Sequence, residues 1–167
     1  AHIQRRFGME HHPAGPWMRD YIKAVRAVWE AWQNGARLNH EGDFYKIDLV
    51  VPLFDPGPIE HPGIPIHVAA VNRLMCKVAG ELGDGIRPHP VCTPSYIEEV
   101  MLPAVREGAT KTGRSLENFR VSMKPLVAAA PNEEELQLKI GDARARIAFY
   151  ASTPAYVAAF RHLGLDE

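Results

Sequence analysis

Three short segments of the chain carry residue types that could bind a ligand or move a proton. The first is the run Ala69-Ala70-Val71-Asn72, in which small residues end an apolar stretch just before a helical pattern begins. Small side chains let a ligand approach the backbone, and the free amides at a helix N-terminus attract phosphate. Asparagine is also a common helix N-cap, and its residue type alone favours this simpler role for Asn72. Both interpretations stay open.

The second segment is Gly85-Ile86-Arg87-Pro88-His89, which ends in a histidine. A histidine at the carboxyl end of a strand can hydrogen-bond a ligand or shuttle a proton. An ordinary histidine in a surface loop is the alternative interpretation of His89. The third segment, FRVSMKPLVAAA, ends in alanines that offer no side-chain chemistry, and its Lys124 is interpreted as a residue at the solvent edge of a strand.

Several familiar kinds of site lack their sequence motifs here. The histidines form no His-x-His or His-x-x-x-His pair, so we expect no metal site. Neither Cys76 nor Cys92 has the basic neighbours of an activated thiol. The sequence also lacks Gly-x-Gly-x-x-Gly, a Walker-type Gly-Lys-Ser and Gly-x-Ser-x-Gly, which disfavours the common nucleotide-binding sheets and a serine hydrolase.

The elements that must position these segments follow a pattern of strand and then helix. Nearly continuous apolar runs predict strands at residues 64–71, 85–88 and 119–129, each followed by residues at helical spacing. Strands that are apolar on both faces are typical of a parallel sheet with outer helices. We therefore expect three adjacent parallel strands in this order, in either a doubly wound sheet or part of a (β/α)₈ barrel.

Local signals define the helices more closely. Asn72 followed by Leu74, Met75, Val78, Ala79 and Leu82 predicts a helix with these apolar residues on its buried face. Thr93 and Pro94 predict the start of the next helix, with a kink at Pro103. Asn132 and Glu135 predict a capping box. Leu136, Ile140, Ala143, Ile147 and Tyr150 are then expected to line one helix face.

The part of the chain before the first strand has a different pattern. Apolar residues at steps of three and four predict a long helix over residues 16–34, and Glu41-Gly42-Asp43 predicts the turn of a short hairpin. A stretch rich in Pro and Gly follows at residues 52–65. We therefore expect one α/β domain with helices at 1–35, a hairpin and Pro-rich insertion at 36–63, and a (βα)₃ segment at 64–167.

Composition and charge exclude some function classes. The 167 residues carry 19 Lys+Arg against 20 Asp+Glu, and a net charge of −1 argues against a general binder of nucleic acid or acidic membranes. No apolar stretch approaches the roughly 18 residues of a membrane span. Two cysteines cannot build a disulfide framework, which predicts a reducing compartment, and we expect a cytoplasmic protein.

The order of several segments resembles the luciferase-like monooxygenase superfamily. These segments are RRFGME, PWMRDYIKAVRAVWEAWQNG, EGDFYKI, FDPGP and IPIHVAAVNRLMCKVAGELGDGIRPHP. The later segments EVMLPAVREGATKTGRS and IAFYASTPAY resemble the branch of deazaflavin (F-420)-dependent oxidoreductases. The resemblance covers essentially the whole chain. It implies part of a (β/α)₈ barrel, in which residues 64–71, 85–88 and 119–129 resemble the fifth, sixth and seventh strands.

The resemblance also implies a cofactor site. The phosphate of FMN or of coenzyme F-420 would rest on the turn after the fifth strand, formed here by Ala70, Val71, Asn72 and Arg73. Asn72 stands where related proteins carry Ser or Gly, which preserves the backbone amides but removes a hydroxyl. Arg19 is the nearest match to an arginine that contacts phosphate in some members. His89 would then act as the catalytic residue.

Two classes of function compete on this basis, and a third, a metal-dependent barrel hydrolase, lacks the ligand spacing it would need. One is a flavin- or deazaflavin-dependent oxidoreductase or monooxygenase, in which the cofactor transfers hydride or activates oxygen on a small organic substrate. The other is a non-enzymatic α/β module that binds a phosphate ligand or a partner. Three strands cannot close a barrel, so we expect a fragment that is inactive alone. Its open sheet would be covered by the remaining strands or by another copy in a homo-oligomer.

Overall fold

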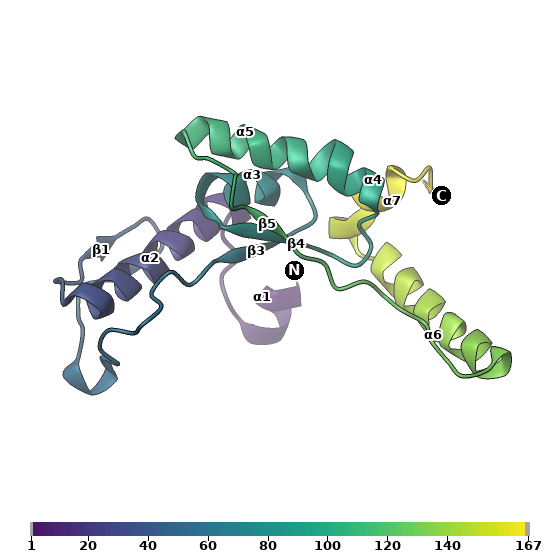
Figure 1. Cartoon of the computed structure of the whole chain (residues 1–167), viewed down its shortest axis with the longest axis horizontal. Helices are drawn as coiled ribbons and strands as arrows, with labels where there is room; N and C mark the ends of the chain where they lie inside the picture. Colours follow the sequence, from purple (N-terminus) through teal and green to yellow (C-terminus); the bar gives the residue numbers. More distant parts are fainter. Residues whose placement is uncertain (1, 166–167) are drawn as a thin grey trace. The chain divides into compact units, whose positions relative to one another are not determined.

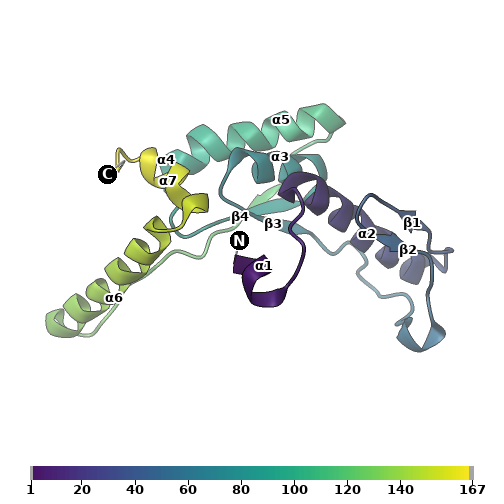
Figure 2. The ribbon, with the colours of Figure 1, turned by 180° about the vertical axis from the view of Figure 1, so that it is seen from behind.

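The computed structural model describes residues 2–165 and divides the chain into two compact units, Ala1–Ile66 and His67–Glu167 (Figures 1 and 2). The boundary falls close to the predicted start of the strand-and-helix segment at residue 64. The division of the first unit at residue 35 stays a prediction.

The first unit is built around one long helix. It contains α1 (His2–Phe7), α2 (Ala14–Asn34), the two-stranded antiparallel hairpin β1 (His40–Glu41) and β2 (Lys46–Ile47), and the 3₁₀ turn η1 (Pro52–Phe54). The predicted helix and hairpin are therefore present, although α2 begins two residues earlier than expected. Gly35 ends α2 in the left-handed conformation, at φ 62°, which a glycine adopts without strain.

A buried carboxylate joins the hairpin to α2. Asp20 lies on α2 and is only 7% exposed. Its Oδ2 accepts hydrogen bonds from the backbone N–H groups of Phe44 and Tyr45, at 2.6 and 3.0 Å, and its Oδ1 lies 2.7 Å from His40 Nε2. A Cβ added at Gly42 would lie 1.9 Å from Asp20 Oδ1, so the turn must carry a glycine. Asp20 therefore fixes the hairpin on the helix.

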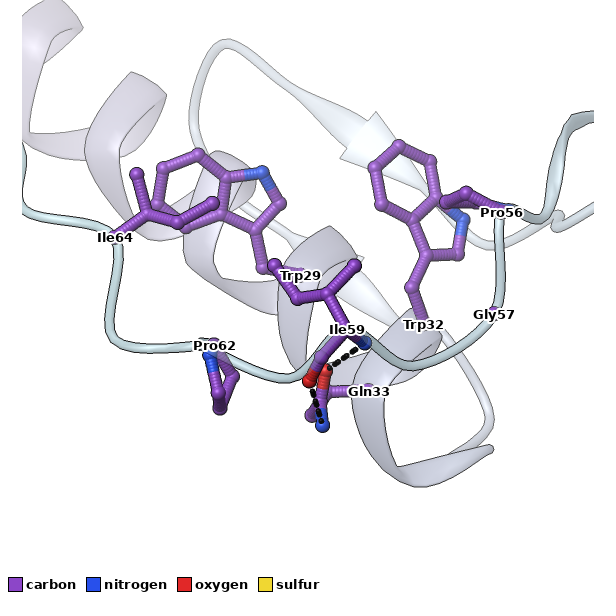
Figure 3. A pocket seen from close by; sticks show the side chains of 8 residues that line it. All are labelled: Trp29, Trp32, Gln33, Pro56, Gly57, Ile59, Pro62 and Ile64. Atoms are coloured by element: carbon purple, nitrogen blue, oxygen red, sulfur yellow. Dashed lines mark hydrogen bonds between the residues drawn. The ribbon is translucent and has the colours of Figure 1, made fainter.

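The Pro-rich loop closes over two tryptophans of the same helix (Figure 3). Trp29 and Trp32 line a pocket of about 210 Å³ together with Pro56, Pro62 and other loop residues. The side chain of Gln33 pairs with the backbone of Ile59, since Ile59 N donates to Gln33 Oε1 at 2.9 Å and Gln33 Nε2 donates to Ile59 O at 3.2 Å. Residues 56–64 are thereby held against α2.

The second unit contains a three-stranded sheet in the order β3-β4-β5, with both neighbouring pairs parallel (Figure 1). The strands are β3 (His67–Ala70), β4 (Gly85–Pro88) and β5 (Arg120–Val121). The predicted order and direction are confirmed, as are the bounds of β4. The predictions over 64–71 and 119–129 are too long, because only the residues beside the four-residue β4 find a pairing partner.

Helices follow each strand as predicted. They are α3 (Arg73–Leu82), α4 (Pro94–Tyr96) continuing through a π-helical turn, η2 (Ile97–Met101), into α5 (Leu102–Thr112), then α6 (Glu133–Ala151), the 3₁₀ turn η3 (Pro154–Tyr156) and α7 (Val157–Arg161). Thr93 Oγ1 accepts from the N–H of Tyr96, and Asn132 Oδ1 accepts from that of Glu135, so both predicted caps are confirmed. The irregular π turn immediately precedes the expected kink at Pro103.

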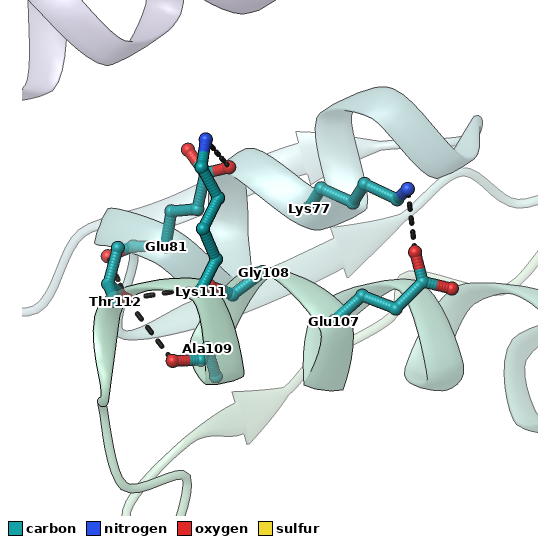
Figure 4. Close-up of polar contacts among 7 residues, drawn as sticks. All are labelled: Lys77, Glu81, Glu107, Gly108, Ala109, Lys111 and Thr112. Atoms are coloured by element: carbon teal, nitrogen blue, oxygen red, sulfur yellow. Dashed lines mark hydrogen bonds and ion pairs between the residues drawn. The ribbon is translucent and has the colours of Figure 1, made fainter.

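Helices α3 and α5 cross with their backbones in contact (Figure 4). A Cβ added at Gly80 would lie 2.0 Å from the oxygen of Val105, and one added at Gly108 would lie 2.1 Å from that of Lys77. Two glycines on opposite helices therefore allow this close approach. Ion pairs flank the crossing, because Lys77 Nζ lies 2.6 Å from Glu107 Oε2 and Lys111 Nζ lies 3.2 Å from Glu81 Oε1.

The buried faces of two helices differ from the sequence prediction. On α3 the buried positions are Cys76, Val78, Ala79, Gly80 and Glu81, whereas Leu74 is 50% exposed. The close glycine contact turns the small-residue side of α3, rather than Leu74, toward α5. Helix α6 contains no buried residue, and its Ile147 is 41% exposed. Its predicted apolar stripe is nevertheless partly covered, because Leu136, Ile140, Ala143 and Tyr150 are half-buried.

Candidate functional site

The turn between β3 and α3 is the first candidate site. Ala70 ends β3 and is buried, Val71 and Asn72 form the turn, and Arg73 begins α3. Two bonds hold this turn from outside. Tyr96 Oη donates to the backbone oxygen of Val71 at 3.2 Å, and Asn72 Nδ2 donates to that of Ala155 at 3.0 Å. Burial raises the pKa of the Tyr96 hydroxyl, which keeps its proton available for this bond.

The N-terminus of α3 lacks a side-chain cap. Asn72 occupies the N-cap position, but its side chain makes no capping hydrogen bond because it is turned toward Ala155. Asn72 therefore has the predicted N-cap position but does not cap the helix through its side chain. Its backbone oxygen accepts the first helical bond, from Cys76 N at 3.2 Å. No residue that the structure describes accepts from the N–H groups of Arg73, Leu74 or Met75, which leaves three donors at the positive end of the helix dipole.

The side chain of Arg73 is engaged away from this turn. Its guanidinium pairs with Glu107 of α5, which also binds Lys77. The hydrogen bond from Lys77, together with that from Arg73, holds the pKa of Glu107 below its usual value despite some desolvation. Arg73 therefore offers its backbone N–H to a ligand at the turn, while its charge is balanced by a carboxylate.

A hollow of about 580 Å³ lies beside the start of α3. Its lining includes Asn72, Arg73 and Tyr96, together with Arg161 and His162 from the end of the chain. Arg161 is exposed, and its side chain makes no hydrogen bond or ion pair with any residue in the described part of the chain. The open helix N-terminus and Arg161 thus border the same hollow, and both favour a negatively charged group.

His89, the second candidate, is held in an aromatic cluster. It is half-buried, its ring stacks on Tyr156 with centroids 4.2 Å apart and planes 22° apart, and Tyr150 meets it edge-on at 4.6 Å. Desolvation by burial lowers the pKa of His89, so the ring is neutral at neutral pH. Val91 N donates to His89 Nδ1 at 3.3 Å, which places the remaining proton on Nε2. His89 can therefore donate a hydrogen bond from Nε2.

One short element contacts both candidates. Within η3, the oxygen of Ala155 accepts from Asn72, and the ring of the next residue, Tyr156, stacks on His89. The turn after β3 and the residue His89 follow neighbouring parallel strands, β3 and β4, and both lie at the carboxyl edge of the sheet. The structure therefore brings these two predicted sites to one end of the second unit.

Arg19 belongs to the other unit. It is half-buried on α2, and its carry-over as a phosphate ligand stays a prediction. Lys124 lies beyond the end of β5, outside any strand, and its exposure agrees with the interpretation of a solvent-facing residue.

Sequence reasoning missed the residues that hold the site together. Tyr96, Ala155, Tyr156 and Arg161 were not singled out, because their contacts join segments far apart in the chain. The helical pattern around Tyr96 predicts a packing residue, and nothing in it indicates the bond to Val71. The one available signal was the cluster of Tyr150 and Tyr156 in the segment IAFYASTPAY.

Two kinds of feature are absent from the described residues. Within residues 2–165 no three His, Cys, Asp or Glu side chains gather in a way that could hold a metal ion. In the same range, no helix has the length and apolar character needed to cross a membrane.

Comparison with known proteins relates this geometry to a family. The model of the luciferase-like monooxygenase family matches residues 1–166. An uncharacterized protein from Mycobacterium tuberculosis (strain ATCC 25618 / H37Rv) is 40% identical over 156 residues, which are 93% of this chain and 46% of that protein. An F420-dependent glucose-6-phosphate dehydrogenase from Mycolicibacterium fortuitum is 31% identical over 121 residues, 70% of this chain and 32% of that protein. The chain thus spans about half the length, or less, of the curated relatives it matches.

Solved structures share the fold. A coenzyme F420-dependent tetrahydromethanopterin reductase from Methanopyrus kandleri superposes with a TM-score of 0.66 at 24% identity, over 89% of this chain and 40% of the reductase. An F420-dependent secondary alcohol dehydrogenase superposes with a TM-score of 0.53 at 22% identity, over 72% of this chain and 34% of its own. The predicted resemblance is confirmed: the chain belongs to the luciferase-like monooxygenase family, and its parallel sheet is part of an incomplete (β/α)₈ barrel.

Proposed function

We propose that the protein carrying this chain is an F420-dependent oxidoreductase that acts on a small organic substrate. The relatives and solved structures described above that carry a named activity are F420-dependent enzymes, and the 31% identical relative is a dehydrogenase. Hydride transfer is therefore favoured over oxygen activation. The observation that carries the proposal is the uncapped N-terminus of α3, where the phosphate of such a coenzyme would find free amides.

The residues of the turn fit a phosphate group. Ala70 and Val71 leave the backbone accessible, the N–H groups of Asn72 and Arg73 would donate to phosphate oxygens, and the helix dipole favours the negative charge. Arg161, at the edge of the same hollow, would add an unpaired cation. The Arg73 side chain takes no part because Glu107 neutralises it. Arg19 remains a proposed contact from the first unit.

His89 would orient the substrate. When bound, the coenzyme supplies the hydride chemistry. Because Nδ1 of His89 accepts from Val91, its Nε2–H would donate a hydrogen bond to the hydroxyl or carbonyl oxygen of the substrate. Tyr156 and Tyr150 would keep the ring in place and exclude water from one side of it. We therefore propose His89 as the catalytic residue of this chain.

The proposed setting of this activity is cytoplasmic. We also propose that the open edges of the sheet are covered by the remaining strands of the barrel or by a second copy of the protein. A native mass near twice that of this chain, or a multiple of it, would agree with this assembly, whereas a well-packed monomer of the chain alone would contradict it.

The test isolates the amide at the start of α3 in the full-length protein. Proline is well tolerated at the first position of a helix and removes only the N–H, so Arg73→Pro is compared with Arg73→Ala, which removes the same side chain. We expect Arg73→Pro to bind F420 about 10-fold more weakly than Arg73→Ala, the loss of one charge-assisted hydrogen bond. Fluorescence titration with F420, and in parallel with FMN, measures both affinities.

Equal F420 affinity in the two variants would remove the phosphate assignment. Tight binding of FMN without binding of F420 would replace the proposed coenzyme, and binding of neither would contradict the oxidoreductase assignment. For His89, replacement by Ala is expected to lower turnover about 100-fold with little change in F420 affinity. An unchanged rate would return His89 to the role of a loop residue.

A further inference from the structure

The two faces of the second unit's sheet differ in exposure. On β3 and β4, Val68 and Ala70 together with Ile86 are buried, in line with the covering of this side by α3 and α5 (Figure 1). The alternate residues Ala69 and Arg87 are exposed, and the register pairs them side by side. Because side chains alternate between faces along a strand, Arg87 lies on the face opposite these helices.

The same face carries further polar groups at the position two residues before Arg87 and at its neighbours on the adjacent strands. The register aligns His67 of β3, Gly85 of β4 and Arg120 of β5. Gly85 leaves room for the ring of His67, since a Cβ there would lie 2.9 Å from His67 Cδ2. His67 Nε2 is buried and has no hydrogen-bond partner among the described residues. This level of the face thus holds a polar group that the described chain does not satisfy.

The charge on this face is uniformly positive. Residues 64–71, 85–90 and 119–130, which form and flank the strands, contain Arg87, Arg120 and Lys124 but no Asp or Glu. Neither the Arg87 nor the Arg120 side chain makes a hydrogen bond or ion pair with any residue that the structure describes, although the backbone N–H of Arg120 donates to the oxygen of Asp84. The carboxylates nearest in sequence, Asp84 and Glu81, pair with Arg114 and Lys111. The described strands therefore leave the guanidinium of Arg87 without a counter-charge.

An arginine at this position is unusual for a barrel. The interior of a (β/α)₈ barrel is filled mainly by Val, Ile and Leu, and this face becomes the interior when a barrel closes. A guanidinium that loses water there is costly unless an anion pairs with it. β4 is the central strand of the three, and its neighbour beside Arg87 on β3 is Ala69, which carries no charge. An anion must therefore come from outside these strands.

The position of Arg87 favours a ligand as the source of that anion. Arg87 is one residue from the carboxyl end of β4, the edge at which barrel enzymes bind substrates. Its neighbour Ala69 has only a methyl side chain and is exposed, which leaves space beside the guanidinium. His89 follows two residues later, about 6.6 Å farther along the strand direction. One small molecule can span the distance between Arg87 and His89.

We propose that Arg87 binds an anionic group, a carboxylate or a phosphate, of the substrate, with Arg120 adding positive charge below it. This inference rests on the proposed oxidoreductase function, and it names the chemical class of the substrate: a small oxyanion whose reacting carbon lies toward His89. The planar guanidinium presents two parallel N–H donors to two oxygens of either group.

The experiment measures anion binding in the full-length protein, without turnover. Inorganic phosphate and malonate are titrated separately at constant ionic strength, and the rise in Tm gives each apparent affinity. We expect at least one of the two anions to bind, with and without saturating F420. The variant Arg87→Met should weaken that binding by about 10- to 100-fold. Arg87→Lys keeps the charge but loses the two parallel N–H donors of the guanidinium, and it should weaken the binding less.

The matched control is Arg106→Met, because Arg106 is exposed on α5, a helix of the covered side of the sheet. This variant should bind the anions like the parent protein. The affinity of Arg87→Met for F420 should remain within about threefold of that of the parent protein. If the parent protein does not bind F420, the proposed oxidoreductase function is contradicted, whereas the anion titration still tests Arg87.

Several outcomes would overturn the proposal for Arg87. Anion binding that saturating F420 abolishes would assign the anions to the coenzyme's phosphate site. Unchanged anion binding in Arg87→Met would show that the guanidinium has another counter-charge. Binding of neither anion to the parent protein would contradict an oxyanion site on this face.

Discussion

Asn72 Nδ2 donates a hydrogen bond to the backbone oxygen of Ala155 at 3.0 Å, across 83 residues of sequence. The bond diverts the asparagine from the capping role that its position favours and ties the turn after β3 to η3. Because Tyr156 in η3 also stacks on His89, the two candidate sites share one support. Loosening of η3 would therefore disturb both the turn that presents the amides of α3 and the stacking of His89.

Replacing Asn72 by Ala should loosen η3 and α7. The lost hydrogen bond is exposed and is expected to contribute at most about 1 kcal/mol, which corresponds to up to roughly fivefold more frequent opening. Hydrogen–deuterium exchange of residues 154–161 measures the change. Asn132→Ala, which removes the cap of α6, serves as the control and should accelerate exchange only near Glu135. Unchanged exchange around Ala155 in Asn72→Ala would show that other contacts hold η3.

The glycines of the helix crossing should tolerate no side chain. A Cβ at Gly80 or Gly108 would lie 2.0 or 2.1 Å from a backbone oxygen of the opposite helix, so either Gly→Ala change should cost about 2–4 kcal/mol of unfolding free energy. Gly141 on α6 has nothing within 4 Å, and Gly141→Ala should be neutral or stabilise by up to about 1 kcal/mol. Urea unfolding of the three variants checks the contrast, and similar losses in all three would contradict the crossing.

Asp20 should make the first unit sensitive to acid. Burial alone would raise the pKa of Asp20, but hydrogen bonds from Phe44 N, His40 and Tyr45 N outweigh burial and hold the pKa below its usual value. The carboxylate therefore stabilises the folded state fully above its unfolded pKa of about 3.9, and this contribution is lost as the pH falls through the lower folded pKa. Asp20→Asn should lower Tm at pH 7 and flatten its fall below about pH 4.

Thermal unfolding of both proteins from pH 7 to pH 2 provides the measurement. Glu117→Gln is a suitable control, because Glu117 is exposed and its backbone rather than its side chain makes the local hydrogen bond. If Asp20→Asn kept the acid-induced fall of the parent protein, the dependence would have to come from other carboxylates.

The two thiols should be unreactive in the folded protein. Cys76 and Cys92 are free and buried, and desolvation raises the pKa of Cys76 to about 12 and raises that of Cys92 as well. Since the thiolate is the reactive form, alkylation by iodoacetamide at pH 8 should be more than about 1,000-fold slower in the native protein than in guanidinium chloride. Mass spectrometry of timed samples counts the modified cysteines. Rapid labelling of either thiol under native conditions would indicate local opening around α3.

Local patterns predicted the elements, whereas the contacts between them came only with the structure. The apolar runs located all three parallel strands and their order, although in the described residues only one face of β3 and β4 is fully buried. The length of β5 was overestimated because pairing depends on the neighbouring strand and not on residues 119–129 themselves. Capping by Thr93 and Asn132 was predictable, since each bond closes within three residues.

The candidate site was only partly predictable for the same reason. The turn at Asn72 and the position of His89 followed from strand ends, but the bond to Ala155 and the stacking on Tyr156 join distant segments. Leu74 was assigned to the buried face because its apolar side chain fits the helical period, yet α5 approaches α3 along its glycine side. Asp20 gave no signal in a stripe of apolar residues, although it proved to be the polar centre of the first unit.

The close crossing of α3 and α5 has a consequence for how the sequence of this unit can diverge. Because each glycine lies against the backbone of the other helix, enlargement of either residue must displace the partner helix. Such a displacement would move Glu107 away from Arg73 and Lys77, leaving two cations unneutralised near the start of α3. Gly80 and Gly108 therefore restrict one another's substitution, and neither can drift independently. Variation should accumulate instead at the exposed positions of α6, a helix without a fully buried residue.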